Sequence, residues 1–344
     1  MVSRVVLVTG VSRHLGARVA RALEADPAVG RVIGVDVVPP PEDLGRTEFV
    51  RADIRNPVIA KVISAADVDT VVHLAVVATP FGAGGRSSMK EINVIGTMQL
   101  LAACQKTPSV QRLVVRSSAT VYGASPRDPA LFTEDMEPRG LPRSGYAKDV
   151  FEVEGYVRGF GRRRPDVDVT VLRFTNFVGP SVDTPFTRYF GLPVIPTVLG
   201  YDPRLQFLHE DDGREVLRRA AVEDHPGTFN VAGDGVLLLS QAARRAGRLT
   251  LPLPTPTASV VGQMIRRAGL VDVSPEQLGI LTHGRAVDTT RLKQGFGYEP
   301  KYGTAEAFDA FVSARGPGEI TPERVRGVER RLAGLLTGGR RSRG

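Results

Sequence analysis

The sequence predicts an α/β fold built on a doubly wound parallel sheet. Two observations support this: short runs of β-branched residues recur through the first half of the chain, and helix-forming stretches separate them. The predicted strands are Val5–Val8, Val32–Val35, Val71–Leu74, Leu113–Val115 and Val169–Leu172. Parallel strands need crossover connections, and Ala17–Ala25 and Asn93–Gln105 have the length and composition of crossover helices.

The domain organisation follows from where this alternation stops. We expect residues 1–179 to form the sheet domain, with segments around 205–235 completing the sheet. Beyond Pro180 the chain breaks into pieces punctuated by proline and glycine, so 180–204 and 236–314 are predicted to form a small C-terminal α/β substrate lobe. Within 315–344, Thr321 as N-cap and Pro322 at the first helical position predict a C-terminal helix followed by a basic tail.

Composition narrows the class of partner. The net charge is +8 in 344 residues, but the basic residues are scattered apart from arginine clusters at 162–164 and 340–343, which does not favour a nucleic-acid partner. The longest apolar runs have strand length, and the N-terminus leads into a strand without a signal peptide, so we expect a cytoplasmic protein without a membrane partner. The single cysteine, Cys104, lies in an apolar helical pattern; it is expected in the core, and no metal site is predicted.

A glycine turn follows the first predicted strand. Gly10 permits a sharp turn and Gly16 permits close packing of the next helix, whose N-terminus can then hold a pyrophosphate. The second strand ends in Asp36, 20 residues after Gly16, where a carboxylate accepts hydrogen bonds from an adenosine ribose. Together these features predict a Rossmann-type dinucleotide site, with Asp36 favouring NAD over NADP.

The middle of this turn departs from the usual glycine pattern. Between the two glycines the chain carries Ser12, Arg13, His14 and Leu15, all expected near the cofactor. Arg13 places a cation where a glycine usually lets the pyrophosphate approach. It can pair with the pyrophosphate or reach a 2′-phosphate, and NADP therefore stays open as the alternative cofactor.

Seven further motifs make a family resemblance visible: "VRADIRN", "VVHLAV", "EINVIGT", "RSSATVYG", "VLRFTNFVGP", "FLHEDD" and "GTFNVAG" occur in this order. The chain resembles the NAD-dependent epimerase/dehydratase family of extended short-chain dehydrogenases/reductases from Val5 to about Phe311, and "SSATVYG" is close to the form in UDP-glucose 4-epimerases. The resemblance implies an oxidoreductase or isomerase, and it allows a homodimer.

The resemblance also assigns cofactor residues. It implies that Asp53, with Ile54 beside it, contacts adenine and that Lys148 contacts the nicotinamide ribose. Further residues expected along the cofactor or behind the active site are Leu74, Ala75, Val76, Asn93, Ser117 and Phe174. His73 is expected to be a hydrogen-bonded core residue rather than a functional one.

The catalytic residues match the family only in part. The resemblance places the substrate-orienting hydroxyl at Ser118, with Ser117 as its neighbour. The family's Tyr-x-x-x-Lys pattern puts both side chains on one helix face. Here Ser144 stands four residues before Lys148, Tyr146 stands two before it, and Val150 follows Tyr146 by four.

Two interpretations of this gap follow. Either Tyr146 enters the site from an irregular turn, or the acid–base is absent and Ser118, Ser144 and water support substrate-assisted chemistry, because serine cannot ionise near neutral pH. The sequence favours the second interpretation, in which the acid–base tyrosine is absent.

The substrate residues implied by the resemblance are Asn176, Arg204 and His209. The match is loose, because Leu205 stands where UDP-sugar epimerases have arginine, four residues before His209. We therefore expect an NAD(P)-dependent oxidoreductase or epimerase acting on a nucleotide sugar or another hydroxyl or ketone compound. The alternatives are a non-catalytic dinucleotide sensor, an atypical ketoreductase, and an RNA-binding derivative of the fold, which the +8 charge would serve.

Overall fold

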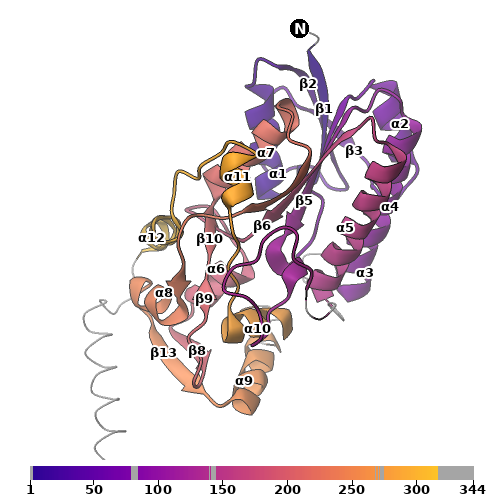
Figure 1. The fold of residues 1–344 in the computed structure, drawn as a ribbon. Coiled ribbons are helices and arrows are strands. Elements are labelled where there is room, and N and C mark those ends of the chain that lie inside the picture. The colour runs from indigo at the N-terminus through magenta and orange to yellow at the C-terminus, as the bar shows by residue number, and fades with distance from the viewer. Residues whose placement is uncertain are drawn as a thin grey trace, which may run out of the picture.

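The computed structural model describes residues 3–78, 84–138, 140, 145–267, 269, 271 and 275–316. Its centre is a sheet of seven parallel strands in the order β11-β6-β5-β4-β1-β2-β3 (Figure 1). Their bounds are β1 Arg4–Thr9, β2 Val29–Asp36, β3 Glu48–Arg51, β4 Thr70–His73, β5 Arg112–Ser118, β6 Asp168–Phe174 and β11 Gly227–Val231.

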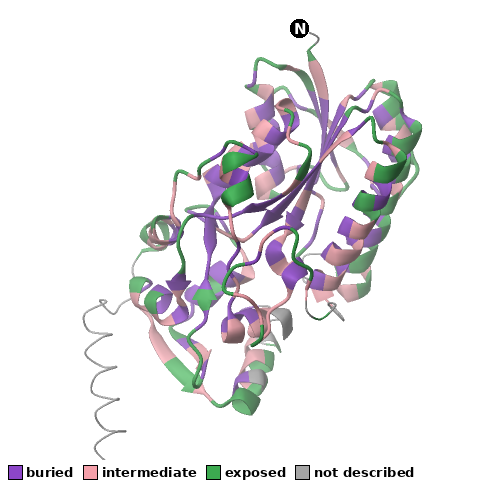
Figure 2. Ribbon diagram, in the orientation of Figure 1, coloured by how far each residue is buried: buried purple, intermediate pink, exposed green. Residues whose placement is uncertain are grey.

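Helices cover both faces of this sheet. On one face α1 packs against α7, and on the other α4 packs against α2 and α5 (Figure 1). The two helical layers bury separate apolar clusters against the sheet, which is mostly purple in Figure 2. The helices with residues in these layers are α1 His14–Glu24, α2 Val58–Ala65, α4 Thr97–Lys106, α5 Gly145–Arg163, α7 Glu210–Val222 and α11 Thr290–Gln294.

The strand order reverses direction at β1. The connections run outward from β1 in both directions, since β1 pairs with β2 on one side and β4 on the other. In open parallel sheets, ligands bind beyond the carboxyl ends of the strands at such a point of reversal. The structure therefore places the predicted glycine turn after β1, and the "RSSATVYG" segment after β5, at the same edge of the sheet.

A second group of smaller elements lies beyond that edge (Figure 1). Its core is an apolar cluster that includes Phe190, Phe207 and Phe308, whose rings pack within 6.1 Å of one another. Its strands form three pairs: β7 Asn176–Val178 with β10 Phe207–His209, β8 Val194–Val198 with β13 Leu249–Leu253, and β9 Arg204–Leu205 with β12 Leu237–Leu238. Its helices are α6 Pro185–Phe190, α8 Leu239–Arg245, α9 Thr255–Arg267, α10 Pro275–His283 and α12 Thr304–Arg315.

The predicted fold class is confirmed, because the five predicted strands coincide with strands of the sheet, with Leu74 just beyond the end of β4, and both predicted crossover stretches form helices. The second predicted crossover, Asn93–Gln105, begins inside a π-helix, η2 Glu91–Gly96, and continues in α4; the short helix α3 Arg86–Lys90 precedes it. Within 205–235 only β11 joins the large sheet. Cys104 is fully buried among the helices of one layer, as expected. The helix predicted to start at Thr321 lies outside the described residues.

Candidate active site

The turn between β1 and α1 is closed by two glycines. Gly10 has φ +81°, and a Cβ there would lie 2.9 Å from the Cα of Ala75. A Cβ on Gly16 would lie 2.1 Å from the carbonyl oxygen of Gly10. No side chain caps the N-terminus of α1, so its first N–H groups remain available to an anion, and the turn has the shape of a pyrophosphate cradle.

Asp36 ends β2 beside this turn. One carboxylate oxygen accepts the Ser12 backbone N–H at 3.0 Å, and the other accepts the Val37 N–H at 2.8 Å. The Ser12 hydroxyl donates to the carbonyl of Val38. The structure therefore brings Gly10, Gly16 and Asp36 to one place, as the sequence predicts, although Asp36 already serves two backbone donors of its own chain.

Arg13 stands at the N-cap of α1 and its side chain is exposed. Crowding by neighbouring protein groups lowers the pKa of the Arg13 guanidinium, the Asp36 carboxylate opposes this shift, and Arg116 adds to it. The Arg13 side chain thus lies within electrostatic reach of both the end of β2 and the end of β5. Its position fits a counter-charge for the phosphates of a bound nucleotide.

A cavity near this edge lies beyond β5 and β6. Side chains from β5, η3 Ala119–Tyr122, α5, β6, β7, α6 and α10 line it. Among the residues predicted from the sequence, those lining it are Ser117, Ser118, Tyr146, Phe174 and Asn176. These predicted residues contribute two hydroxyls, a phenol and an amide to a partly apolar enclosure.

Tyr146 and Ser118 meet in this cavity. Burial raises the pKa of the Tyr146 phenol, and the charge of Arg116 and a hydrogen bond with Ser118 act in the opposite direction. Ser118 also accepts the Thr120 backbone N–H at 3.2 Å, which orients its hydroxyl at the start of η3. A phenol and a serine side by side at the end of a strand can hold and move a proton on a substrate oxygen.

The start of α5 explains why Tyr146 reaches this position. Gly145 opens the helix with φ +71°, a conformation that favours glycine, and Tyr146 follows in the first turn. One turn later on the same face is Val150, which is buried. Lys148 projects elsewhere, with its Nζ 3.8 Å from a Glu152 carboxylate oxygen, and it does not line the cavity.

The sequence analysis left open whether Tyr146 enters the site. Tyr146 lines the cavity beside Ser118, and Val150 stands four residues after it, at the spacing that the family pattern gives its lysine. Ser144, the predicted substitute, lies outside the described residues.

The two faces of β5 separate Ser117 from Ser118. The Ser117 hydroxyl donates to the buried carboxylate of Glu154 at 2.5 Å. Arg173 pairs with the same carboxylate at 2.7 and 2.9 Å. Ser117 therefore anchors α5 to the sheet, although it also borders the cavity.

Arg116 shares the face of Ser118 and was missed by the sequence analysis. Its Nη1 lies 3.4 Å from the carbonyl oxygen of Val76, and its guanidinium carbon lies 5.8 Å from the centre of the Phe177 ring. The signal was present in "RSSATVYG", because residues two apart on a strand point to the same side.

Several other predicted cofactor residues make contacts within the protein near the edge of the sheet. Asn93 bonds the backbone of Val77 in both directions, at 2.7 and 2.9 Å, and donates to Asp149 at 3.2 Å. The Asp53 carboxylate is bound by Arg55, whose hydrogen bond is the main cause of a lowered Asp53 pKa. The predicted residues Leu74, Val76, Ile54 and Leu15 are buried or partly buried apolar contacts.

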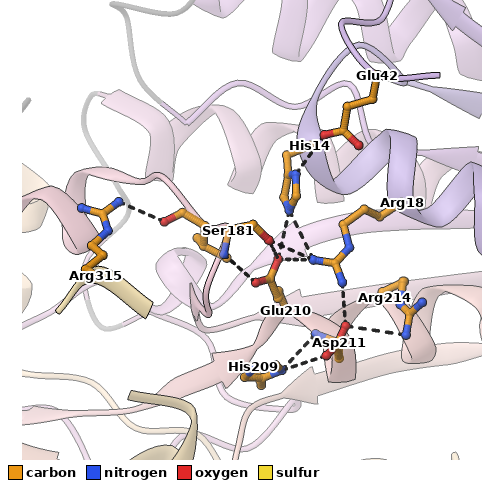
Figure 3. Close-up of polar contacts among 10 residues, drawn as sticks. His14, Arg18, Glu42, Ser181, His209, Glu210, Asp211, Arg214 and Arg315 are labelled. Atoms are coloured by element: carbon orange, nitrogen blue, oxygen red, sulfur yellow. Dashed lines mark hydrogen bonds and ion pairs between the residues drawn. The ribbon is translucent and has the colours of Figure 1, made fainter. Parts of the chain in front are cut away.

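His14 joins a polar network rather than standing alone at the turn (Figure 3). Its Nε2 lies 2.9 Å from a Glu210 carboxylate oxygen. Glu210 also pairs with Arg18 and accepts the Ser181 backbone N–H at 2.9 Å. The network ties the first turn of α1 to the first turn of α7 and to the loop after β7.

Two predicted substrate residues do not reach the cavity. His209 is buried, accepts the Asp211 N–H at 3.2 Å and stacks on Tyr302 with ring centres 3.9 Å apart. Arg204 borders a different, more polar cavity together with Arg285. Of the three residues predicted for the substrate, only Asn176 lines the cavity of Ser118 and Tyr146.

The described part of the chain contains neither a membrane-crossing helix nor a cluster of metal-ligand side chains. Within it, no helix is both long and apolar enough to cross a membrane. Nor do those residues contain a group of three or more His, Cys, Asp or Glu side chains arranged to hold a metal ion.

The doubly wound sheet, the glycine cradle with Asp36 and the adjoining hydroxyl-lined cavity define a Rossmann-type protein with a second, smaller group of elements beyond the sheet edge. The sequence pattern of the NAD dependent epimerase/dehydratase family matches residues 6–232. The chain belongs to this family.

The chain is similar in sequence or in structure to the following proteins. The uncharacterized protein Rv0501 of Mycobacterium tuberculosis is 49% identical over 337 residues, which cover 96% of this chain and 90% of the relative. The UDP-glucose 4-epimerase of Thermus thermophilus, solved with NAD, has a TM-score of 0.70 at 21% identity, covering 91% of this chain and 99% of that one. The UDP-glucose 4-epimerase of Thermotoga maritima, solved with UDP-glucose, has a TM-score of 0.69 at 20% identity, covering 90% and 98%.

Proposed function

We propose that this protein is an NAD-dependent oxidoreductase or epimerase in which Tyr146 is the acid–base and Ser118 orients the substrate oxygen. The observation that carries this proposal is that Tyr146 and Ser118 line one cavity, at the same edge of the sheet as the glycine cradle. Side chains that move protons must lie within hydrogen-bond reach of the reacting oxygen, and both hydroxyls face the same enclosure.

The residues at the cradle fit a dinucleotide. A side chain at Gly10 or Gly16 would collide with backbone, so the turn keeps the close approach that a pyrophosphate needs. Arg13 supplies a cation for phosphate, and Asp36 lies where an adenosine ribose would be read. Because Asp36 disfavours a 2′-phosphate by charge repulsion, we propose NAD as the preferred cofactor and NADP as the weaker one. A bound nicotinamide supplies hydride acceptance and return.

The protein's own part of the chemistry is proton transfer and positioning. During oxidation the ionised Tyr146 phenol takes the proton of the substrate hydroxyl, and the Ser118 hydroxyl donates a hydrogen bond to the oxygen that becomes a carbonyl. During reduction the same phenol returns the proton to that oxygen. The roles are reversible, so one site can serve a net redox reaction or an epimerisation.

The proposed substrate is a small hydroxyl or ketone compound, with a nucleotide sugar as the first class to test. Asn176 supports this, because it supplies an amide in the same cavity as Tyr146. The similar UDP-glucose 4-epimerase of Thermotoga maritima holds UDP-glucose. Arg204, the residue predicted to bind a diphosphate, lines a different cavity, so other hydroxyl compounds belong in the same screen.

The test combines binding with turnover. Calorimetry with NAD and NADP measures the cradle, and product analysis by mass spectrometry and NMR after incubation with UDP-sugars and simpler ketones measures the chemistry. Tyr146→Phe should lower turnover at least ~100-fold while NAD affinity stays the same. Tyr156→Phe, an exposed tyrosine on the same helix, is the matched control and should retain activity. Turnover that survives Tyr146→Phe would return the substrate-assisted ketoreductase to first place.

A second candidate is a dinucleotide-binding protein without turnover. The observation that favours it is Val150, because a buried valine stands where the family pattern places a lysine on the nicotinamide ribose. Tight NAD binding with no substrate converted across the screen would support this candidate. A failure to bind any nicotinamide nucleotide would reject both proposals.

A further inference from the structure

Tyr146 is surrounded mainly by apolar side chains. It packs on a cluster that includes Val150, Val121 and Phe132. Within the described residues, the charged groups that act on its phenol are Arg116 on β5, Asp149 on α5, and Arg285 in the segment after α10. Ser118 adds a neutral hydroxyl. In such surroundings a phenolate forms only where a neighbouring cation stabilises it.

Two of these three charged groups have partners of their own. Arg86 binds the Asp149 carboxylate at 2.5 and 2.6 Å. Arg285 donates to the Gly123 carbonyl at 2.9 Å and feels the negative charge of Asp128. Their net effect on the phenol is therefore reduced by their own partners.

Arg116 is different. Within the described residues its one hydrogen bond is the long 3.4 Å contact with the Val76 carbonyl, and its Nε has no hydrogen-bond partner there. Within the same residues it forms no ion pair with a carboxylate. It lines the cavity together with Ser118 and Tyr146, since Arg116 and Ser118 share one face of β5.

We propose that Arg116 is the positioning residue that stabilises the Tyr146 phenolate, a cation supplied by the strand instead of by the helix that carries the tyrosine. The proposal rests on the proposed role of Tyr146 as acid–base. The step it affects is simple: the phenol O–H bond breaks, the proton passes to solvent, and the phenolate left beside the guanidinium then accepts the substrate's hydroxyl proton. Neither Val150 nor the outward-pointing Lys148 supplies this charge.

The experiment titrates Tyr146 directly. The full chain is produced with 3-fluorotyrosine, whose more acidic phenol titrates at lower pH and reports by fluorine NMR. The chain has 7 tyrosines, and the signal of Tyr146 is the one missing from Tyr146→Phe. The variants are Arg116→Gln and Arg116→Met, which remove the charge, Arg116→Lys, which retains it, and Lys148→Gln as the rival cation. Arg162→Gln, at the exposed end of α5, controls for the loss of any arginine.

The proposal predicts that both neutral Arg116 variants raise the Tyr146 midpoint by at least ~1 unit, the low end of the effect of an adjacent opposite charge. Arg116→Lys should recover most of that shift, and Lys148→Gln and Arg162→Gln should leave the midpoint in place. A midpoint unmoved in Arg116→Gln and Arg116→Met, or a larger shift in Lys148→Gln, overturns it. The titration needs neither cofactor nor substrate, so it can fail while Tyr146-dependent turnover stands, or succeed where no turnover is found.

Discussion

Glu210 accepts the backbone N–H of Ser181 at 2.9 Å, and its carboxylate thereby fastens α7 to the loop after β7. The same carboxylate pairs with Arg18 and lies 2.9 Å from His14 on α1 (Figure 3). Burial by itself would raise the pKa of Glu210, but the hydrogen bonds from Ser181 and His14 and the charge of Arg18 bring it below its usual value. One buried carboxylate thus links the first helix, α1, to α7 and to the loop after β7.

Removing this link should destabilise the fold. Glu210→Ala leaves the Arg18 guanidinium without its buried partner, and we expect the free energy of unfolding to fall by ~3 kcal/mol, the lower end for breaking a buried pair. Asp211→Ala is the matched control, because Asp211 pairs with the same Arg18 at 2.7 Å but is 38% exposed, and it should cost less than ~1 kcal/mol. Urea unfolding monitored by circular dichroism gives both values. Equal losses in the two variants would contradict a special role for Glu210.

Cofactor choice should depend on Asp36 and Arg13 in opposite ways. Asp36→Asn removes the charge that repels a 2′-phosphate, so the ratio of NADP to NAD affinity should rise by ~10-fold. Arg13→Gln removes a phosphate partner, so affinity for both nucleotides should fall, by more for NADP if the side chain reaches a 2′-phosphate. Calorimetric titration of each variant with both nucleotides measures these ratios. An unchanged ratio in Asp36→Asn would show that Asp36 does not read the ribose.

Neighbouring serines on β5 should separate chemistry from stability. Ser118→Ala removes the hydroxyl beside Tyr146, and we expect kcat/KM to fall by ~10- to 100-fold with stability nearly unchanged. Ser117→Ala removes a donor from the buried Glu154 carboxylate, so it should cost ~1–2 kcal/mol of folding free energy instead. Thermal unfolding and kinetics on the same preparations distinguish the two. If Ser118→Ala lost stability and Ser117→Ala lost activity instead, the assignment of the two serines to opposite faces of β5 would be wrong.

The fold was predictable because its signals are local. Strands such as β1 and β5 contain short apolar runs, Val5–Val8 and Leu113–Val115, that are buried or partly buried on both faces, as is typical of parallel strands covered on both sides. The glycine turn was predictable for a related reason: φ +81° at Gly10 and the close contact at Gly16 restrict those positions to one residue type.

The active site was predictable only in part because it depends on where a helix begins. A pattern counted back from Lys148 gives Ser144 as the partner of the lysine. The face that α5 presents to the cavity depends on where the helix begins, which the sequence alone does not fix, and Tyr146 lies on that face. Arg204 and His209 were assigned from the order of motifs, whereas their side chains are directed by packing in the smaller lobe.

His73 offers a test in which the sign of a pH effect can be worked out. The Thr97 hydroxyl donates to the Asn93 carbonyl at 2.6 Å, so it accepts from His73 Nε2 at 2.9 Å. The other ring nitrogen, Nδ1, then accepts the Thr9 hydroxyl at 2.8 Å, which makes the ring neutral with its proton on Nε2. Burial lowers the pKa of His73 from 6.5 to about 4. This agrees with the expectation that His73 is a hydrogen-bonded core residue.

Because the unfolded chain binds a proton at this histidine near pH 6.5 and the folded protein does so only near pH 4, acid favours unfolding. The stability due to the neutral ring is complete above pH 6.5 and is lost progressively as the pH falls toward 4, amounting to ~2 kcal/mol lost at pH 5. Urea unfolding at pH 7 and pH 5 should show this loss in the wild type and in His283→Gln, whose ring lies at the surface cavity beside Tyr201. In His73→Gln this pH-dependent loss of unfolding free energy should be absent, although that variant has a lower stability at pH 7. If His73→Gln lost as much stability between pH 7 and pH 5 as the wild type does, the titration would belong to another group and the neutral, buried ring would not be its cause.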